Sequence, residues 1–116
     1  MRAQADAEAF RVAASGADYQ AAALSLAAEV ANTWFELLTQ RTQQELASAQ
    51  LDTNRDVLSL IRARFGIGES ASADVLRQRQ LVEASREQLL TVQARTRVLE
   101  HQLAVLLGEP PKGVVF

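Results

Sequence analysis

The sequence predicts an all-α protein that folds as a long antiparallel helical hairpin of the coiled-coil type. Composition is the first observation: the 116 residues include no cysteine, 2 prolines and only 5 % aromatic residues, while Ala, Leu, Gln, Glu and Arg recur throughout. The second is that no proline interrupts residues 2–65. The third is that two stretches repeat apolar residues every three and four positions, which is typical of coiled coils.

The first helix is expected at about residues 2–65, and Gly16 is its only glycine. The alternative is two helices joined near Ser15 and Gly16. A heptad seam with polar interruptions is formed by Ala23, Leu26, Val30, Thr33, Leu37, Gln40, Gln44, Ala47, Leu51, Asn54, Leu58, Ile61 and Phe65.

A second, weaker apolar stripe runs about one residue away from this seam. It consists of Ala31, Phe35, Leu38, Leu46, Thr53, Val57 and Leu60. The first helix is therefore expected to face two neighbours rather than one. Trp34 and Phe35 are interpreted as core-filling residues, and the alternative is a belt where a helical barrel meets another layer.

A tip loop is expected at residues 66–72. Gly66 and Gly68 are predicted to end the first helix because glycine tolerates left-handed backbone. Ser70, Ser72 and Asp74 are predicted to supply capping oxygens and a negative charge for the next helix.

The second helix is expected at about residues 73–107. Its seam consists of Val75, Gln78, Val82, Ser85, Leu89, Val92, Thr96, Leu99, Leu103 and Leu106. Gly108 and the pair Pro110–Pro111 are expected to stop it, leaving a tail at 108–116. Because the first helix is longer, the stretch before about Thr33 should extend past the second helix. We therefore expect residues 1–116 to form a single helical hairpin.

Charge and composition exclude several classes of function. The net charge is −2, with 12 basic residues scattered among 14 acidic ones, so nucleic acid is not an expected partner. No apolar run approaches the roughly 20 residues that span a bilayer. Neither a nucleophile triad nor a phosphate-binding loop is present, so no enzyme activity is expected.

No metal or cofactor site is predicted. The pairs Asp52/Asp56 and Glu83/Glu87 have the one-turn spacing of a di-metal helical site. Such sites usually add a Glu-x-x-His motif, and Val98 stands three residues before His101, the only histidine. These acids are interpreted as a solvated face.

Arginines gather near the tip on both helices: Arg62, Arg64, Arg77 and Arg79. Two interpretations stay open. In the first, the arginines form ion pairs with neighbouring helices or meet acidic groups of a partner. In the channel family that the turn segment resembles, as described below, such pairs would hold the entrance closed. Alternatively, the arginines form an ordinary solvated face whose ion pairs contribute only a few tenths of a kcal/mol each.

The turn segment RFGIGESASADVL, residues 64–76, resembles the periplasmic hairpin tip of TolC-like outer-membrane efflux channels. Arg64, Phe65, Gly68 and Asp74 stand at the spacings of that family's tip. The segments RQRQLVEA at 77–84 and QLAVLLGEPP at 102–111 resemble the NodT-type lipoprotein branch. The stretch LSLAAEVA at 24–31, followed by WFEL at 34–37, is similar to the helix that leads into the family's first hairpin.

The resemblance implies that the chain is the first periplasmic hairpin of a longer outer-membrane lipoprotein. Members form trimers whose hairpins build a periplasmic helical barrel, a passive conduit for exported small molecules. An inner-membrane pump is then an indirect partner. The hairpin tip docks a periplasmic adapter protein, a role that the resemblance gives to Arg64, Phe65, Gly66, Ile67, Gly68, Glu69, Ser70, Ser72 and Asp74.

The tip departs from the family pattern at two positions. Glu69 and Ala71 stand where many members have a small hydrophobic residue and a Ser or Thr. Proline at Gly68 is expected to impair docking without disturbing the fold. The alternative function is a self-contained coiled-coil interaction module. For the isolated chain we expect high helicity and self-association, because one hairpin cannot bury two apolar stripes.

Overall fold

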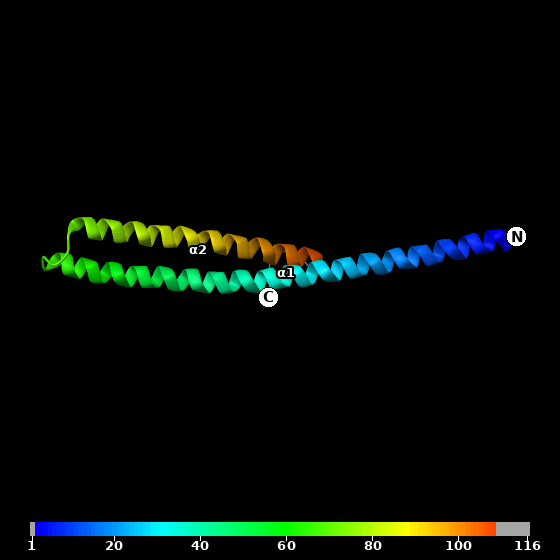
Figure 1. Cartoon of the computed structure of the whole chain (residues 1–116), viewed down its shortest axis with the longest axis horizontal. Coiled ribbons are helices and arrows are strands. Elements are labelled where there is room, and N and C mark those ends of the chain that lie inside the picture. The colour runs from blue at the N-terminus through cyan, green and yellow to red at the C-terminus, as the bar shows by residue number, and fades with distance from the viewer. Residues whose placement is uncertain (1, 109–116) are drawn as a thin grey trace.

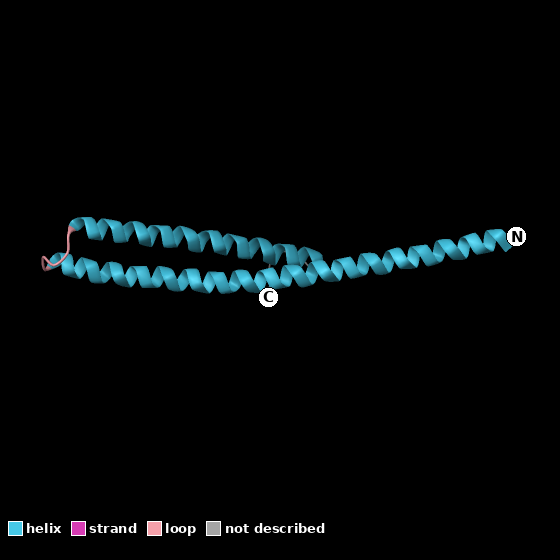
Figure 2. Ribbon diagram, in the orientation of Figure 1, coloured by secondary structure: helices cyan, strands magenta, loops and turns pink. Residues whose placement is uncertain are grey.

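The computed structural model describes residues 2–108 as two helices that form an antiparallel hairpin (Figures 1 and 2). Helix α1 spans Arg2–Gly66 and helix α2 spans Ser72–Leu106. The hairpin measures 99 × 23 × 15 Å, and the part of the chain that is described contains no strand. The fold is therefore the all-α hairpin that the sequence predicts. Of the predicted tail at 108–116, only Gly108 lies within the described residues, so the expected stop at Pro110–Pro111 lies outside them.

Helix α1 is continuous for 65 residues, including at Gly16. A glycine inside a helix costs roughly 1 kcal/mol relative to alanine, too little to break a helix surrounded by strong helix formers. The alternative of two helices joined near Ser15 and Gly16 is therefore wrong.

The predicted heptad seam holds the two helices together. Every seam residue of α1 from Val30 to Ile61, and every seam residue of α2 from Val75 to Leu106, is buried or half-buried. Leu37, Leu99 and Leu103 are at most 2 % exposed and form one apolar cluster. The seam prediction is confirmed wherever α1 has α2 beside it.

A second apolar cluster lies nearer the tip, and a polar layer crosses it. Leu51, Leu58 and Val82 form the cluster. The Asn54 amide donates a hydrogen bond to the Ser85 hydroxyl over 2.6 Å, and the Gln78 amide donates to the Asn54 backbone carbonyl over 3.0 Å. Such a paired polar layer favours one register of the hairpin, because any shift leaves half-buried amides without partners.

The first part of α1 has no partner helix within the hairpin. All residues from Arg2 to Glu29 are exposed, and this stretch, blue to cyan in Figure 1, extends well past the end of α2. The predicted overhang is confirmed. Ala23 and Leu26 of the predicted seam are exposed because α2 does not reach them. Phe65, the last residue of the predicted seam, lies at the tip and is 48 % exposed.

Trp34 and Phe35 do not fill the core, so that interpretation is wrong for the hairpin itself. Trp34 is 37 % exposed and Phe35 is 65 % exposed. Trp34 directly follows the seam residue Thr33, and Phe35 precedes Leu37 by two residues. Because successive residues are about 100° apart on a helix, neither side chain points along the seam. Two aromatic residues are thus left on the outside of the hairpin.

Candidate functional site

The hairpin tip is a tightly hydrogen-bonded turn. Gly68 has a φ of +79° and its N–H donates to the carbonyl of Phe65 over 3.1 Å. The N–H of Glu69 donates to the carbonyl of Arg64 over 2.8 Å. These two bonds form a Schellman motif, which satisfies carbonyls at the end of α1 and fixes the direction of the loop.

This geometry corrects two expectations about the tip glycines. Gly66 is the last residue of α1 and has no positive φ, so only Gly68 requires a left-handed backbone. Proline at Gly68 would remove the donated hydrogen bond and fix φ near −65°. A Gly68→Pro variant therefore disturbs the turn itself, and its effect would not isolate partner docking.

The start of α2 is capped differently from the sequence prediction. Ala71, not a serine, is the N-cap residue, with φ −80° and ψ 153°. Its N–H donates to the Asp74 carboxylate over 3.4 Å, which is one half of a capping box. Alanine has no oxygen to complete the other half, and Ser70 and Ser72 make no capping bond. Of the three predicted caps, Asp74 alone contributes.

The apex of the turn exposes one large apolar side chain. Ile67 is 71 % exposed, and Phe65, two residues before it, is 48 % exposed. Glu69 and Ser72 are exposed as well, while Ser70 is half-buried. The turn thus combines a hydrogen-bonded backbone with an uncovered isoleucine.

The tip arginines do not form a single cluster. Arg62 and Arg79 line one groove between the helices, together with Arg55 and Arg86. The Arg77 guanidinium lies 3.7 Å from the Asp74 carboxylate of its own helix. Arg64 is exposed, and its side chain forms no ion pair within the described residues. The sequence analysis did not single out Arg55 or Arg86. Their signal was the heptad spacing, since Arg55 stands seven residues before Arg62 and Arg86 seven residues after Arg79.

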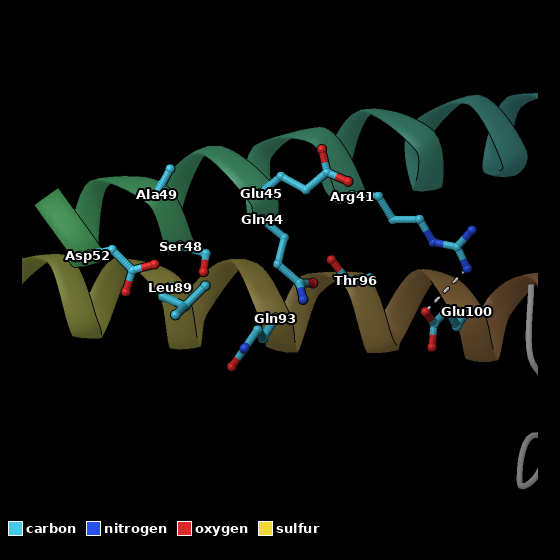
Figure 3. A pocket seen from close by; sticks show the side chains of 10 residues that line it. All are labelled: Arg41, Gln44, Glu45, Ser48, Ala49, Asp52, Leu89, Gln93, Thr96 and Glu100. Carbon is cyan, nitrogen blue, oxygen red and sulfur yellow. Dashed lines mark ion pairs between the residues drawn. The ribbon is translucent and has the colours of Figure 1, made fainter.

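Ion pairs between the two helices lie far from the tip. Figure 3 shows the Arg41 guanidinium reaching across to Glu100, with a nitrogen to oxygen distance of 3.6 Å. On the other side of the seam, Arg95 lies 3.8 Å from Glu36. The groove of Figure 3, about 560 Å³, is polar and open, with Gln44, Gln93 and other polar side chains along it. These two pairs join α1 to α2, and neither includes one of the four tip arginines.

One member of each acidic pair singled out in the sequence is engaged with an arginine of its own helix. Asp52 lies 3.8 Å from Arg55, and Glu83 lies 3.2 Å from Arg86. Within residues 2–108 no group of three or more acidic or histidine residues is arranged to hold a metal ion.

The second apolar stripe of α1 remains uncovered. Its seven residues are all exposed, and they include Phe35 at 65 %, Leu46 at 58 % and Leu60 at 51 %. Exposed leucines also line α2, with Leu76 at 58 % and Leu90 at 57 %. A hairpin with a complete inner seam and further apolar residues outside has surface for additional helices. Neither helix, over the described stretch, has the length and apolarity that crossing a membrane requires.

Comparison with known proteins assigns the family. The family model described as outer membrane efflux protein matches residues 1–109. The chain is 34 % identical over 101 residues to the pyoverdine export outer membrane protein OpmQ of Pseudomonas aeruginosa, an alignment that covers 87 % of this chain and 21 % of that protein. It is 35 % identical over 97 residues to OpmQ of Pseudomonas putida, with 84 % and 21 % covered.

A more distant relative belongs to a different bacterium. Nodulation protein T of Rhizobium leguminosarum bv. trifolii is 26 % identical over 102 residues, covering 88 % of this chain and 22 % of that protein. No solved structure gives a significant match. The chain spans about a fifth of the length of these relatives. Because the family model covers residues 1–109 of the 116, the chain belongs to the outer membrane efflux protein family.

Proposed function

We propose that this chain is a periplasmic wall segment of an outer-membrane efflux channel, with the hairpin tip docking a periplasmic adapter protein. The channel is a passive conduit for exported small molecules and works with an inner-membrane pump that this hairpin meets only through the adapter. The longer protein is an outer-membrane lipoprotein that assembles as a trimer. This channel and transport role requires no enzyme activity or cofactor of the hairpin.

One observation supports the wall role above the others: the exposed second apolar stripe of α1. A two-helix module needs only its inner seam, and here that seam is complete from Val30 to Ile61. The additional row at Phe35, Leu46 and Leu60 is accounted for when a second helical neighbour packs against the same helix, as in a ring of hairpins.

Two features of the tip support the docking role. The Schellman bonds at Gly68 and Glu69 hold the turn in one conformation, so little ordering entropy is lost when a partner binds. Ile67, at the apex, presents apolar area that the hairpin leaves uncovered. A rigid turn with an exposed apolar side chain is a suitable anchor for a protein partner.

Disrupting the second stripe tests the wall role in the full-length protein. Leu60→Glu is expected to lower the amount of assembled oligomer and the export of substrates at least about tenfold, because an unpaired carboxylate buried between helices costs several kcal/mol. The control is Ser59→Glu, which adds the same charge at the neighbouring exposed position outside the stripe. Native gels of detergent-extracted outer membranes measure assembly.

Equal assembly of the two variants would contradict the wall role. It would favour the alternative, a self-contained coiled-coil module whose outer residues contact nothing.

A further inference from the structure

A groove of about 330 Å³ near the tip is lined mainly by arginines. Arg55 and Arg62 come from α1, and Arg79 and Arg86 come from α2. We call these four residues the arginine edge. Each directly follows a seam residue of its own helix, so all four lie on the same side of the hairpin. Leu58 and Val82 form the apolar floor, and Glu83 is the one acid in the lining.

The positive charge of this edge is only partly compensated within the hairpin. Within α2, Arg86 lies 3.2 Å from Glu83, and within α1, Arg55 lies 3.8 Å from Asp52. Both ion pairs are exposed. Arg62 and Arg79 form no ion pair within residues 2–108, although they line the groove from opposite helices. The edge therefore keeps two positive charges that repel each other and favour an anionic partner.

The spacing of the arginines favours a helix over a small anion as that partner. Arg55 and Arg62 are seven residues apart, as are Arg79 and Arg86, so the guanidinium groups form rows with a repeat of about 10 Å. A small anion is held by donors that converge on one point, whereas a heptad row matches carboxylates on the edge of a neighbouring coiled-coil helix.

The opposite edge of the hairpin does not complement the arginine edge. At the same height along the hairpin it presents Val57, 36 % exposed, and Leu81, 49 % exposed. The one carboxylate there, Asp74, is already engaged by Arg77 at 3.7 Å. Identical hairpins placed side by side in register, with the arginine edge of one against this opposite edge of the next, would thus desolvate arginines against apolar side chains without an acidic partner, which is unfavourable.

We propose that the arginine edge binds an acidic edge of an unlike helical hairpin, supplied by the part of the longer protein outside these 116 residues. The inference rests on the proposed function for the source of that hairpin, and the chain's coverage of only about a fifth of its relatives leaves room for one. The acidic edge carries carboxylates at heptad spacing. The arginine edge then determines which hairpin is the neighbour on this side.

The test uses the 116-residue chain and two designed four-heptad helical peptides that differ only in having Glu or Gln along one edge. Fluorescence anisotropy at low salt is expected to show about tenfold tighter binding of the Glu peptide, a difference that high salt removes. Arg62→Glu with Arg79→Glu should abolish the preference. The matched control, Arg2→Glu with Arg11→Glu in the exposed overhang, makes the same change in net charge and should retain it.

Three results would overturn the proposal. The first is equal loss of preference in the control variant, which means that any arginine suffices. The second is loss of the chain's own self-association in the Arg62→Glu, Arg79→Glu variant alone, which assigns the edge to a like copy. The third is thermal stabilisation of the wild-type chain, but not of that variant, by millimolar inorganic phosphate, which indicates a small-anion site. None of these readouts depends on export, so the proposed function stands or fails separately.

Discussion

Replacing Leu99 with alanine in the 116-residue chain is expected to lower the free energy of unfolding by about 3 kcal/mol. Leu99 is 1 % exposed and packs with Leu37 and Leu103, so truncation leaves a cavity in the cluster at the open end of the hairpin. For one hairpin this is a large share of the total stability, because small cores contribute few kcal/mol in all.

The measurement is urea unfolding followed by circular dichroism at a fixed protein concentration, since association also stabilises the folded chain. Leu90→Ala is the matched control: the same substitution on the same helix at a residue that is 57 % exposed. Its effect should stay within about 0.5 kcal/mol. Equal loss of stability in both variants would contradict the assignment of Leu99 to the core of the hairpin.

The second large effect is expected for function rather than stability. In the full-length protein, Ile67→Asn should reduce export by about tenfold or more, because it removes the apolar anchor at the tip. The folded hairpin should be unaffected, since Ile67 is 71 % exposed and lies outside both apolar clusters. Asparagine is also well tolerated at the end of a helix.

Export is measured in a host that lacks its own efflux channels, as the tolerance of that host to a panel of toxic substrates. The amount of protein in the outer-membrane fraction is measured in parallel. Ile67→Val keeps most of the apolar volume and should export normally. Full tolerance of the host carrying the Ile67→Asn variant would contradict a docking role for the tip.

The long-range pairing of the hairpin was predictable because it depends on one repeating pattern. Residues such as Leu37, Leu58 and Leu99 recur at heptad spacing, and a seam of that length admits one antiparallel partner within the chain. The polar residues Asn54 and Ser85 were visible as interruptions of the seam. Their hydrogen bond to each other was not, because it depends on the register of the two helices.

Local features at the turn were harder to predict. Two glycines separated by one residue offer two places to end a helix, and the Schellman bonds select Gly68. Three polar residues offer caps for α2, yet the backbone places Ala71 at the N-cap. The arginines divide between two edges because neighbouring sequence positions lie about 100° apart on a helix. Trp34 lies outside the seam for the same reason.

The most direct test of the account is to locate the contact of the tip in the assembled export system. A photo-crosslinking amino acid replaces Ile67 in the full-length protein, and in a control it replaces Tyr19, which is 77 % exposed in the overhang. Both proteins are expressed with a periplasmic adapter and irradiated in intact cells, and crosslinked partners are identified by mass spectrometry. We predict a crosslink to the adapter from position 67 and none from position 19. Absence of the adapter crosslink at position 67, or its presence at both positions, would contradict the account.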